Sequence, residues 1–240
     1  MLITTEVIHP LRLAIISDIH ANYEALRATL KAIRYYDALV CLGDLVGYGA
    51  QPNEVVEEIH QLNPKIIVAG NHDYACVTGD TSNFVTHAAR AIEWTRQELK
   101  RENLAFLSRL PYHSTETINN IVVASYHGSP SDPLNEYVYP GAPQFVFQAL
   151  VEEANANLLL LGHTHIPFHS STPSGTLINP GSIGQPRDGD PRSSYATVEI
   201  SDGKIDCTIE RIPYDIDSAA SRIVQRGLPT FLADRLFVGI

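Results

Sequence analysis

Short apolar segments recur along the chain, and each of them is followed at once by polar residues. Runs of this length that are rich in Ile, Val and Leu are too short for buried helices, so they predict β-strands. Such strands are expected at Leu11–Ser17, Ala38–Leu42, Lys65–Ala69, Ile121–Tyr126 and Leu158–Leu161. The chain is therefore expected to have a sheet at its core.

Between the strands, apolar residues recur every three or four positions, which is the spacing of an amphipathic helix. Helices are expected at Tyr23–Tyr35, Pro52–Leu62, Asn83–Arg101 and Pro143–Ala154. The second of them begins with a proline, which the first turn of a helix favours. The order strand, helix, strand, helix, strand at the start of the chain favours parallel pairing there.

The second half of the chain is richer in strands. Asn119-Asn120 and Asp202-Gly203 stand between β-like runs and are typical of tight hairpin turns. Antiparallel strands are expected at Thr176–Asn179, Ser194–Ile200 and Lys204–Ile212. A mixed α/β start and a strand-rich end together predict two sheets packed face to face as a β-sandwich, with helices outside.

No repeat, low-complexity tract or Pro/Gly/Ser-rich linker divides the 240 residues, and 44% of them are hydrophobic, enough for a substantial core. We therefore expect a single domain over residues 1–240. The motifs described below span about residues 11–212. Residues 215–240 are expected to form a helix and a turn, to which the sequence assigns no chemistry.

Composition and charge argue against several classes of function. The formal net charge is −10 and no cluster of Lys or Arg stands out, so binding to a long nucleic acid is not expected. No apolar run is long enough to cross a membrane, and the N-terminus does not resemble a signal peptide. The 3 cysteines form no C-x-x-C pair, so neither a disulfide framework nor a thiolate zinc site is indicated. We expect a protein of the reducing cytoplasm that acts on a small molecule; its oligomeric state stays open.

Each of the first predicted strands stops at residue types that commonly bind metals. Ligands gather outside the carboxyl ends of strands in α/β sheets, and neighbouring strands are only about 5 Å apart. The polar side chains at the strand ends are therefore expected to converge on one site. The segments are Asp18-Ile19-His20, Gly43-Asp44, Gly70-Asn71-His72-Asp73, His127-Gly128 and Gly162-His163-Thr164-His165.

The donor atoms at these strand ends are carboxylates, imidazoles and an amide, without a thiolate. That set suits Mn, Fe, Zn, Ni or a similar divalent ion. Alternation along an extended segment places Asp18 beside His20, and His163 beside His165. There are more candidate ligands than one ion can use. We therefore expect two divalent ions that share a carboxylate, an arrangement typical of phosphoryl chemistry.

The ordered motifs D-x-H, G-D, G-N-H-[DE], H-G and G-H-x-H resemble those of the calcineurin-like metallophosphoesterases. Gly43–Val55 and Asn179–Ala196 are similar to the small bacterial and archaeal phosphodiesterase branch, whose members are related to diadenosine tetraphosphatases. That branch implies a β-sandwich flanked by helices. Ser/Thr protein phosphatases carry G-D-x-V-D-R-G, whereas residues Gly43–Gly49 here lack the second aspartate and the arginine. Protein phosphatase activity is therefore not expected.

Carried over motif by motif, the resemblance implies a role for each residue at the strand ends. Asp44 would bridge two ions, and His72 would be a histidine that faces the substrate without binding metal. The first ion would be bound by Asp18, His20, Asp44 and His165, and the second by Asp44, Asn71, His127 and His163.

The leading interpretation is a dinuclear metal-dependent phosphodiesterase that hydrolyses a small soluble phosphodiester or nucleotide by attack of a metal-bridged hydroxide. His72 would protonate the leaving oxygen. Arg187 and Tyr48 are candidates for substrate contact. Two alternatives stay open. One is a phosphomonoesterase, and the other is a non-catalytic metal-binding scaffold like the retromer subunit, which resembles this fold but lacks the substrate-facing histidine.

Overall fold

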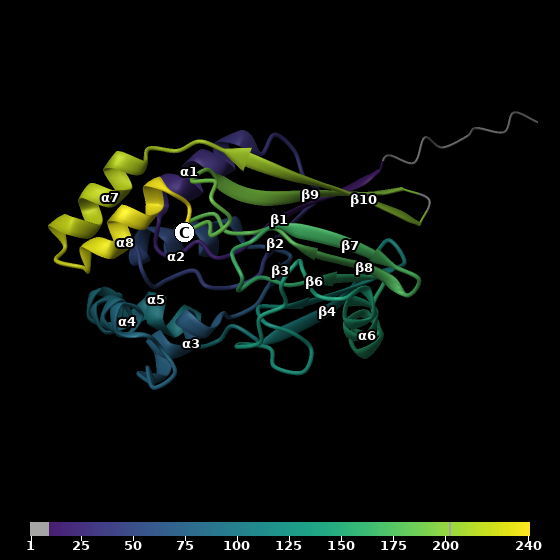
Figure 1. The fold of residues 1–240 in the computed structure, drawn as a ribbon, viewed down its shortest axis with the longest axis horizontal. Coiled ribbons are helices and arrows are strands. Elements are labelled where there is room, and N and C mark those ends of the chain that lie inside the picture. The colour runs from purple at the N-terminus through teal and green to yellow at the C-terminus, as the bar shows by residue number, and fades with distance from the viewer. Residues whose placement is uncertain (1–9, 202) are drawn as a thin grey trace, which may run out of the picture.

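Two five-stranded sheets pack face to face, and helices cover their outer sides (Figure 1). The computed structural model describes residues 10–201 and 203–240. This architecture confirms the mixed α/β fold and the flanked β-sandwich expected from the sequence. None of the helices in the described residues has the length and apolar character needed to cross a bilayer.

The first sheet has the strand order β10-β9-β1-β2-β3. β1 pairs with β2 in parallel, and β2 with β3, while β9 and β10 add an antiparallel hairpin at the other edge. The parallel start and the antiparallel end are both as expected. The bounds are β1 Leu11–Ile16, β2 Ala38–Cys41, β3 Ile66–Ile67, β9 Ser193–Ser201 and β10 Lys204–Ile212.

The second sheet has the order β4-β5-β6-β8-β7. Its centre is parallel, and antiparallel hairpins close both edges. The predicted turn at Asn119 and Asn120 joins β4 to β5, and both residues have the left-handed backbone that such turns require, with φ of 46° and 65°. The bounds are β4 His113–Ile118, β5 Ile121–Tyr126, β6 Leu158–Leu160, β7 Phe168–Thr172 and β8 Gly175–Asn179.

The helices lie outside the sheets and at one end of the molecule. α6 covers the outer side of the second sheet, while α3, α4 and α5 gather at the end where α7 and α8 also lie (Figure 1). The bounds are α1 Tyr23–Ala32, α2 Pro52–Leu62, α3 Asn71–Thr78, α4 Thr86–Glu98, α5 Arg101–Leu107, α6 Gln144–Ala154, α7 Ile216–Gln225, α8 Thr230–Asp234 and a 3-10 turn η1 Arg235–Phe237.

The two sides of β1 serve different parts of the core. Leu13 and Ile15 face the second sheet and pack among its inner residues, whereas Ala14 and Ile16 pack under the helices. This alternation is the period of two that a strand dictates. Because both sides are apolar and buried, the register of β1 is fixed, and so is the position at which its polar tip emerges.

Several elements differ from the expectation. β3 is shorter than Lys65–Ala69, although the amides of Lys65 and Val68 still donate to β2 carbonyl oxygens, so the chain stays extended there. The expected helix Asn83–Arg101 ends at Glu98, because Leu99 is extended, and α5 is a separate helix. α3 was not expected, and the last residues form two helices and η1. Asp202 of the second expected turn lies outside the described residues.

Candidate metal centre

The polar segments leave their strands through strained backbone. Asp18, His20, Asp44, His163 and His165 all have φ between 50° and 67°. A non-glycine residue in this left-handed region costs about 1 kcal/mol or more, and such residues gather at functional sites. Five of the 11 non-glycine residues with positive φ in the described chain are predicted metal ligands. The backbone therefore turns at these residues, whereas the alternation argument from the sequence assumed extended segments.

The glycines beside these ligands are needed because two loops touch. A Cβ atom on Gly43 would lie 2.4 Å from the amide nitrogen of Gly70, and one on Gly70 would lie 2.0 Å from Asp44 Oδ1. Neither approach leaves space for a methyl group. The loop after β2 and the loop after β3 are therefore held in direct backbone contact, which brings Asn71 to Asp44.

We expect Gly70→Ala to disrupt the centre by pushing the Asp44 carboxylate aside. The overpacking should destabilise the fold by about 1–3 kcal/mol and lower the bound metal below half of the wild-type content. Metal content per chain by mass spectrometry and thermal unfolding check both effects. Gly141→Ala is the matched control, since a Cβ there meets no atom within 4 Å. Full metal content in Gly70→Ala would contradict this account of the loop contact.

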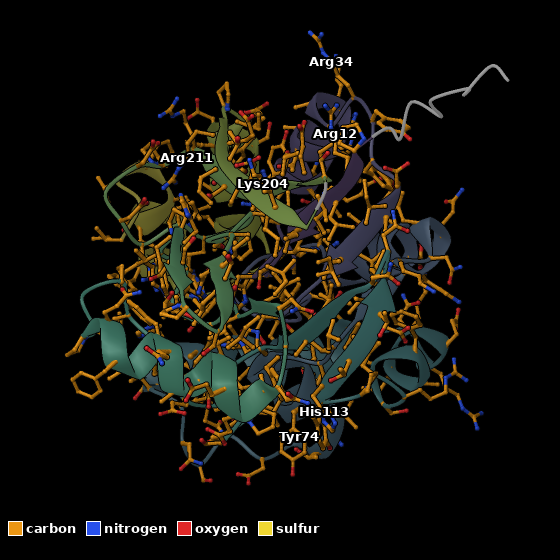
Figure 2. All side chains as sticks on the ribbon, turned by 90° about the vertical axis from the view of Figure 1, so that its right-hand side faces the viewer. Arg12, Arg34, Tyr74, His113, Lys204 and Arg211 are labelled. Atoms are coloured by element: carbon orange, nitrogen blue, oxygen red, sulfur yellow. The ribbon has the colours of Figure 1, made fainter. Side chains whose placement is uncertain are left out.

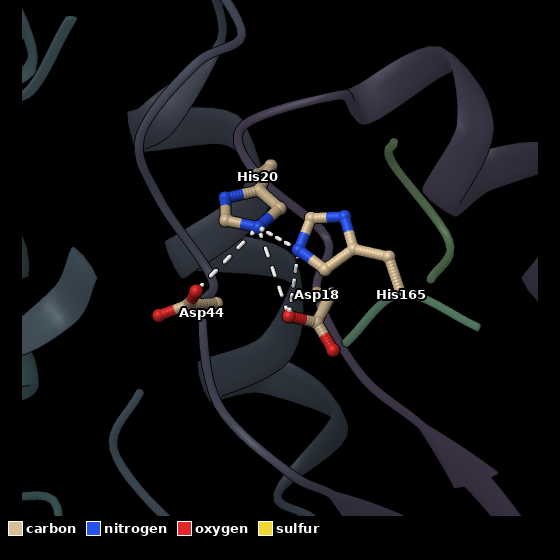
Figure 3. A group of neighbouring side chains, drawn as sticks. All are labelled: Asp18, His20, Asp44 and His165. Carbon is tan, nitrogen blue, oxygen red and sulfur yellow. Dashed lines mark hydrogen bonds and ion pairs between the residues drawn. The ribbon is translucent and has the colours of Figure 1, made fainter. Parts of the chain in front are cut away.

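Two groups of buried side chains meet at the strand ends. In the first, the side chains of two histidines and two aspartates point toward one another (Figure 3). Each residue of a group offers one ligand atom, and these atoms lie within 4.8 Å of one another. Asp44 belongs to both groups, so a single carboxylate joins them. The first group is Asp18, His20, Asp44 and His165, and the second is Asp44, His127 and His163.

Backbone carbonyl oxygens fix the orientation of all four histidines. A carbonyl oxygen only accepts hydrogen bonds, so the ring nitrogen that faces it carries the hydrogen, and in the neutral imidazole the other nitrogen keeps a lone pair that can bind a metal. The partners are Val46 for His20 at 3.1 Å, Leu42 for His127 at 2.7 Å, Asn135 for His163 at 3.1 Å and Gln185 for His165 at 2.5 Å.

The lone-pair nitrogens face one another. Nε2 of His20 lies 3.1 Å from Nε2 of His165, and Nε2 of His127 lies 3.2 Å from Nδ1 of His163. Two acceptor atoms at this distance repel unless a proton or a metal cation lies between them or beside them. The arrangement is therefore that of ligands oriented for cations.

Each aspartate is tethered by one oxygen and leaves the other free. Asp18 Oδ2 accepts from Ser17 Oγ at 2.6 Å and from the amide of His163 at 3.1 Å. Asp44 Oδ1 accepts from the amide of His72 at 2.8 Å. Within the described residues, Asp18 Oδ1, Asp44 Oδ2 and Asn71 Oδ1 are buried without a hydrogen-bond donor. Buried oxygens of this kind are costly unless a cation binds them, so the donor set fits a divalent metal.

The sequence from residue 11 to residue 203 matches the calcineurin-like phosphoesterase superfamily domain. The chain belongs to this superfamily. Its members typically bind divalent metals, and the buried carboxylates and imidazoles described above are placed to do so here. The protein is therefore a metal-dependent phosphoesterase, a hydrolase of phosphoric esters.

Relatives cover nearly the whole chain. An uncharacterized protein of Methanocaldococcus jannaschii is 41% identical in an alignment over 246 residues, gaps included. The alignment covers 95% of this chain and 98% of that protein. The crystal structure of a metallophosphoesterase from Sphaerobacter thermophilus has 35% identity and a TM-score of 0.84, covering 96% of this chain and 100% of the other. A hypothetical protein from Pyrococcus horikoshii has a TM-score of 0.88 at 23% identity, with 96% and 99% covered, and shares the fold.

The electrostatics of the phosphoesterase site favour bound cations. Burial opposes ionisation of Asp18, but His165 and His127 outweigh it and hold the pKa of that carboxyl well below its usual range. Burial likewise opposes protonation of His127, yet Asp44 and Asp18 raise its pKa to about 9. The cluster therefore retains its negative charge and attracts positive charge, which divalent cations would supply.

His72 lies at the start of α3, buried beside the centre and outside both ligand groups. Its ring is 4.4 Å from that of Tyr48, 4.8 Å from that of His20 and 4.9 Å from that of Phe84. Burial lowers its pKa well below the usual value, and Nδ1 has no hydrogen-bond partner in the described chain. The imidazole is therefore neutral in the free protein.

The two candidate substrate residues are neighbours. Arg187 Nη2 donates to the Tyr48 hydroxyl at 3.3 Å and to Gln185 Oε1 at 3.1 Å. The Tyr48 ring lies 4.7 Å from that of His20. The Tyr48 ring thus lies between Arg187 and the candidate ligand His20. Arg187 itself belongs to neither group of ligands.

Sequence reasoning missed two residues at this site. Asp73 joins the two loops, since its carboxylate accepts from the amides of Leu45 at 2.9 Å and Gly70 at 3.0 Å. Its pKa rises to about 7 through burial and the nearby Asp44. Asp73 is the fourth position of the G-N-H-[DE] motif, so that motif could have indicated it.

The other missed residue is Tyr137, whose ring stacks on that of His163 at 3.8 Å between centroids. A second tyrosine, Tyr139, stacks in turn on Tyr137 at 5.8 Å. Both are about half exposed. They lie in a loop without helical or strand periodicity, and no pattern in the sequence indicates them.

A cavity of about 220 Å³ opens beside the second group of ligands. Its wall includes Asn71, Asn135 and Phe84, together with Tyr74 and Leu134. Asn71 has a buried side-chain oxygen without a donor in the described chain, and Asn135 supplies the carbonyl that orients His163. A group bound in this cavity would therefore lie beside a predicted ligand and beside the residue that orients another.

Proposed function

We propose that this phosphoesterase is a dinuclear phosphodiesterase that acts on a small soluble phosphodiester or nucleotide. The observation that supports it most is the position of Asp44, which belongs to both groups of ligand atoms. Asp18, His20, Asp44 and His165 would hold one divalent ion, and Asp44, Asn71, His127 and His163 the other. When bound, the ions supply neutralisation of the phosphate oxygens and lower the pKa of water.

The residues of the chain itself would orient the ester and manage the proton. We assign His72 the role of donor to the leaving oxygen. Because the imidazole is neutral in the free protein, it would take up a proton from solvent as the substrate binds, since the anionic phosphate offsets the burial that lowers the pKa of His72. Asp73 would hold together the two loops that carry Asn71 and Asp44 while the substrate binds.

A diester fits the distribution of positive charge better than a monoester does. A monoester dianion favours an arginine beside the metals, whereas Arg187 is held one ring away by Tyr48. The single charge of a diester needs less compensation. The exposed face of the Tyr137–Tyr139 stack, next to His163, would offer a base or another ring a surface on which to lie.

The partner would be a small molecule, and the surface supports this. Arg12 and Arg34 lie near each other, whereas Arg211 lies apart from them on this side of the molecule (Figure 2). Arg12 pairs with Glu199 at 2.5 Å, and Arg211 pairs with Asp188. Basic side chains that are dispersed and paired in this way do not make the continuous patch that a long nucleic acid requires.

The test is hydrolysis by the pure protein loaded with Mn²⁺. We expect bis-p-nitrophenyl phosphate to be hydrolysed at least about tenfold more efficiently than p-nitrophenyl phosphate, and a chelator to abolish both activities. Release of phosphate from the monoester without diester turnover would establish a phosphomonoesterase instead. A protein that binds two metals but hydrolyses neither ester would support the scaffold alternative.

A further inference from the structure

The end of the chain, beyond the part that matches the superfamily, packs against the metal centre. α7, α8 and η1 form a small core with the loop after β2, in which Leu232 and Leu236 lie against Tyr48 and Ala50. Figure 1 shows the C-terminal residue close to the ends of the strands. This packing fixes η1 beside Tyr48, and with it the side chain of Arg235.

Arg235 and Arg187 both lie against the Tyr48 ring. Their guanidinium carbons are 6.0 Å and 5.7 Å from its centroid. Arg235 Nε donates to the main-chain oxygen of Ile240. The two terminal amino groups of Arg235 take no part in this hydrogen bond. Two positive side chains, from segments almost fifty residues apart, are therefore brought together by one phenol ring.

Neither guanidinium pairs with the side chain of an Asp or Glu in the part of the chain that the structure describes. Arg187 Nε is moreover buried without an acceptor. On α7, by contrast, Arg222 pairs with Glu24 at 3.2 Å, and Arg226, just after that helix, pairs with Glu98 at 3.5 Å. Burial and the nearby Arg187 lower the pKa of Arg235 to about 10. The two guanidinium groups are therefore not neutralised by acidic side chains.

The two arginines also lie close to the predicted metal ligands. The Tyr48 ring that both arginines contact is 4.7 Å from the ring of His20, and the amide of Arg187 donates to the carbonyl oxygen of His165 at 3.3 Å. An anion held by the two arginines would thus be separated by the ring of Tyr48 from the phosphate being hydrolysed. Two half-buried guanidinium groups on one ring are suited to a phosphate, which accepts several charge-assisted hydrogen bonds.

We propose that Arg187 and Arg235 bind a second phosphate of the substrate, so that the preferred substrates are diesters carrying two phosphates close together. The inference rests on the proposed function for the position of the first phosphate. It assigns chemistry to residues 215–240, where the sequence showed none, and it makes the C-terminal helices part of the substrate site.

Binding of compounds that cannot be hydrolysed tests this directly. The protein is loaded with Mn²⁺, freed of excess metal and titrated by calorimetry with methylphosphonate and with diphosphonates joined by one, two or three carbons. We expect at least one diphosphonate to bind about tenfold more tightly than methylphosphonate. Arg235→Gln and Arg187→Gln should each lose most of this preference, Arg235→Lys should keep part of it, and Arg226→Gln should keep all of it.

Equal binding of all the phosphonates to the wild type would overturn the proposal. So would a preference that survives in both glutamine variants, or one that Arg226→Gln loses as well. Thermal unfolding of each variant shows that it is folded, and Arg187→Gln carries the test if Arg235→Gln is not. Turnover plays no part in these titrations. A diphosphonate preference without hydrolysis of bis-p-nitrophenyl phosphate would refute the diesterase function and keep the second phosphate site.

Discussion

Asp44→Asn is expected to abolish hydrolysis and also to lower the stability of the metal-free protein. The asparagine keeps the oxygen that accepts from the amide of His72. It removes the charge shared by both ligand groups, so kcat should fall by about 1,000-fold, or about 4 kcal/mol of transition-state stabilisation.

The stability part of this prediction follows from the surroundings of Asp44 Oδ2. That oxygen lies 3.3 Å from Nε2 of His127 and has no hydrogen-bond donor in the described chain. Burial opposes ionisation of Asp44, but His127 and His72 outweigh it and hold the pKa of that carboxyl well below its usual range, so at neutral pH the ionised carboxylate stabilises the fold. The metal-free variant should therefore unfold at a lower temperature than the wild type.

Three measurements on Asp44→Asn check this together: metal content, diester turnover and thermal unfolding in the presence of a chelator. Asp206→Asn on β10 is the control, since that side chain is exposed. Retention of two metals and of turnover would mean that Asp44 does not bridge. An unchanged unfolding temperature of the metal-free variant would show that the charge of Asp44 does not stabilise the fold.

His72→Asn is expected to slow hydrolysis in a way that depends on the leaving group. A proton donor contributes about 10²–10⁴-fold where the leaving oxygen is a strongly basic alkoxide. It contributes little where the leaving group is p-nitrophenolate, which departs as an anion. We therefore expect a loss of at least about 100-fold for an alkyl diester and a much smaller loss for bis-p-nitrophenyl phosphate.

The ratio of the two losses separates a proton donor from a residue that only positions its neighbours. Equal losses for both leaving groups would assign His72 a packing role, since its ring lies against Tyr48 and Phe84. Metal content should stay at the wild-type level. His169→Asn, on an exposed position of β7, is the matched control and should leave both rates unchanged.

Local pattern predicted most of the fold because the strands are buried on both sides. Segments such as Ala38–Cys41 are apolar throughout, and their ends are marked by an abrupt change to polar residues. A strand that is buried on both sides leaves little freedom in where its last residue emerges. The meeting of Asp18, Asp44 and His163 was therefore expected from spacing and strand order alone.

The remaining features depend on contacts between distant segments. α3 has a weak apolar pattern and is held by Asp73, whose partners lie on another loop. Tyr137 and Arg235 reach the site only because their loops pack there, and no local spacing signals that. The boundary of α4 likewise depends on Leu99, which turns away to allow α5 to pack against α2.

The ligand groups draw on both sheets. In the first group, Asp18, His20 and Asp44 follow strands of one sheet, and His165 follows β6 of the other. Bound ions would therefore cross-link the two halves of the sandwich and stabilise only the assembled chain, by an amount set by the concentration of free metal. A cell short of that metal would lose the protein to unfolding and degradation as well as losing its activity, so its abundance would follow the metal supply.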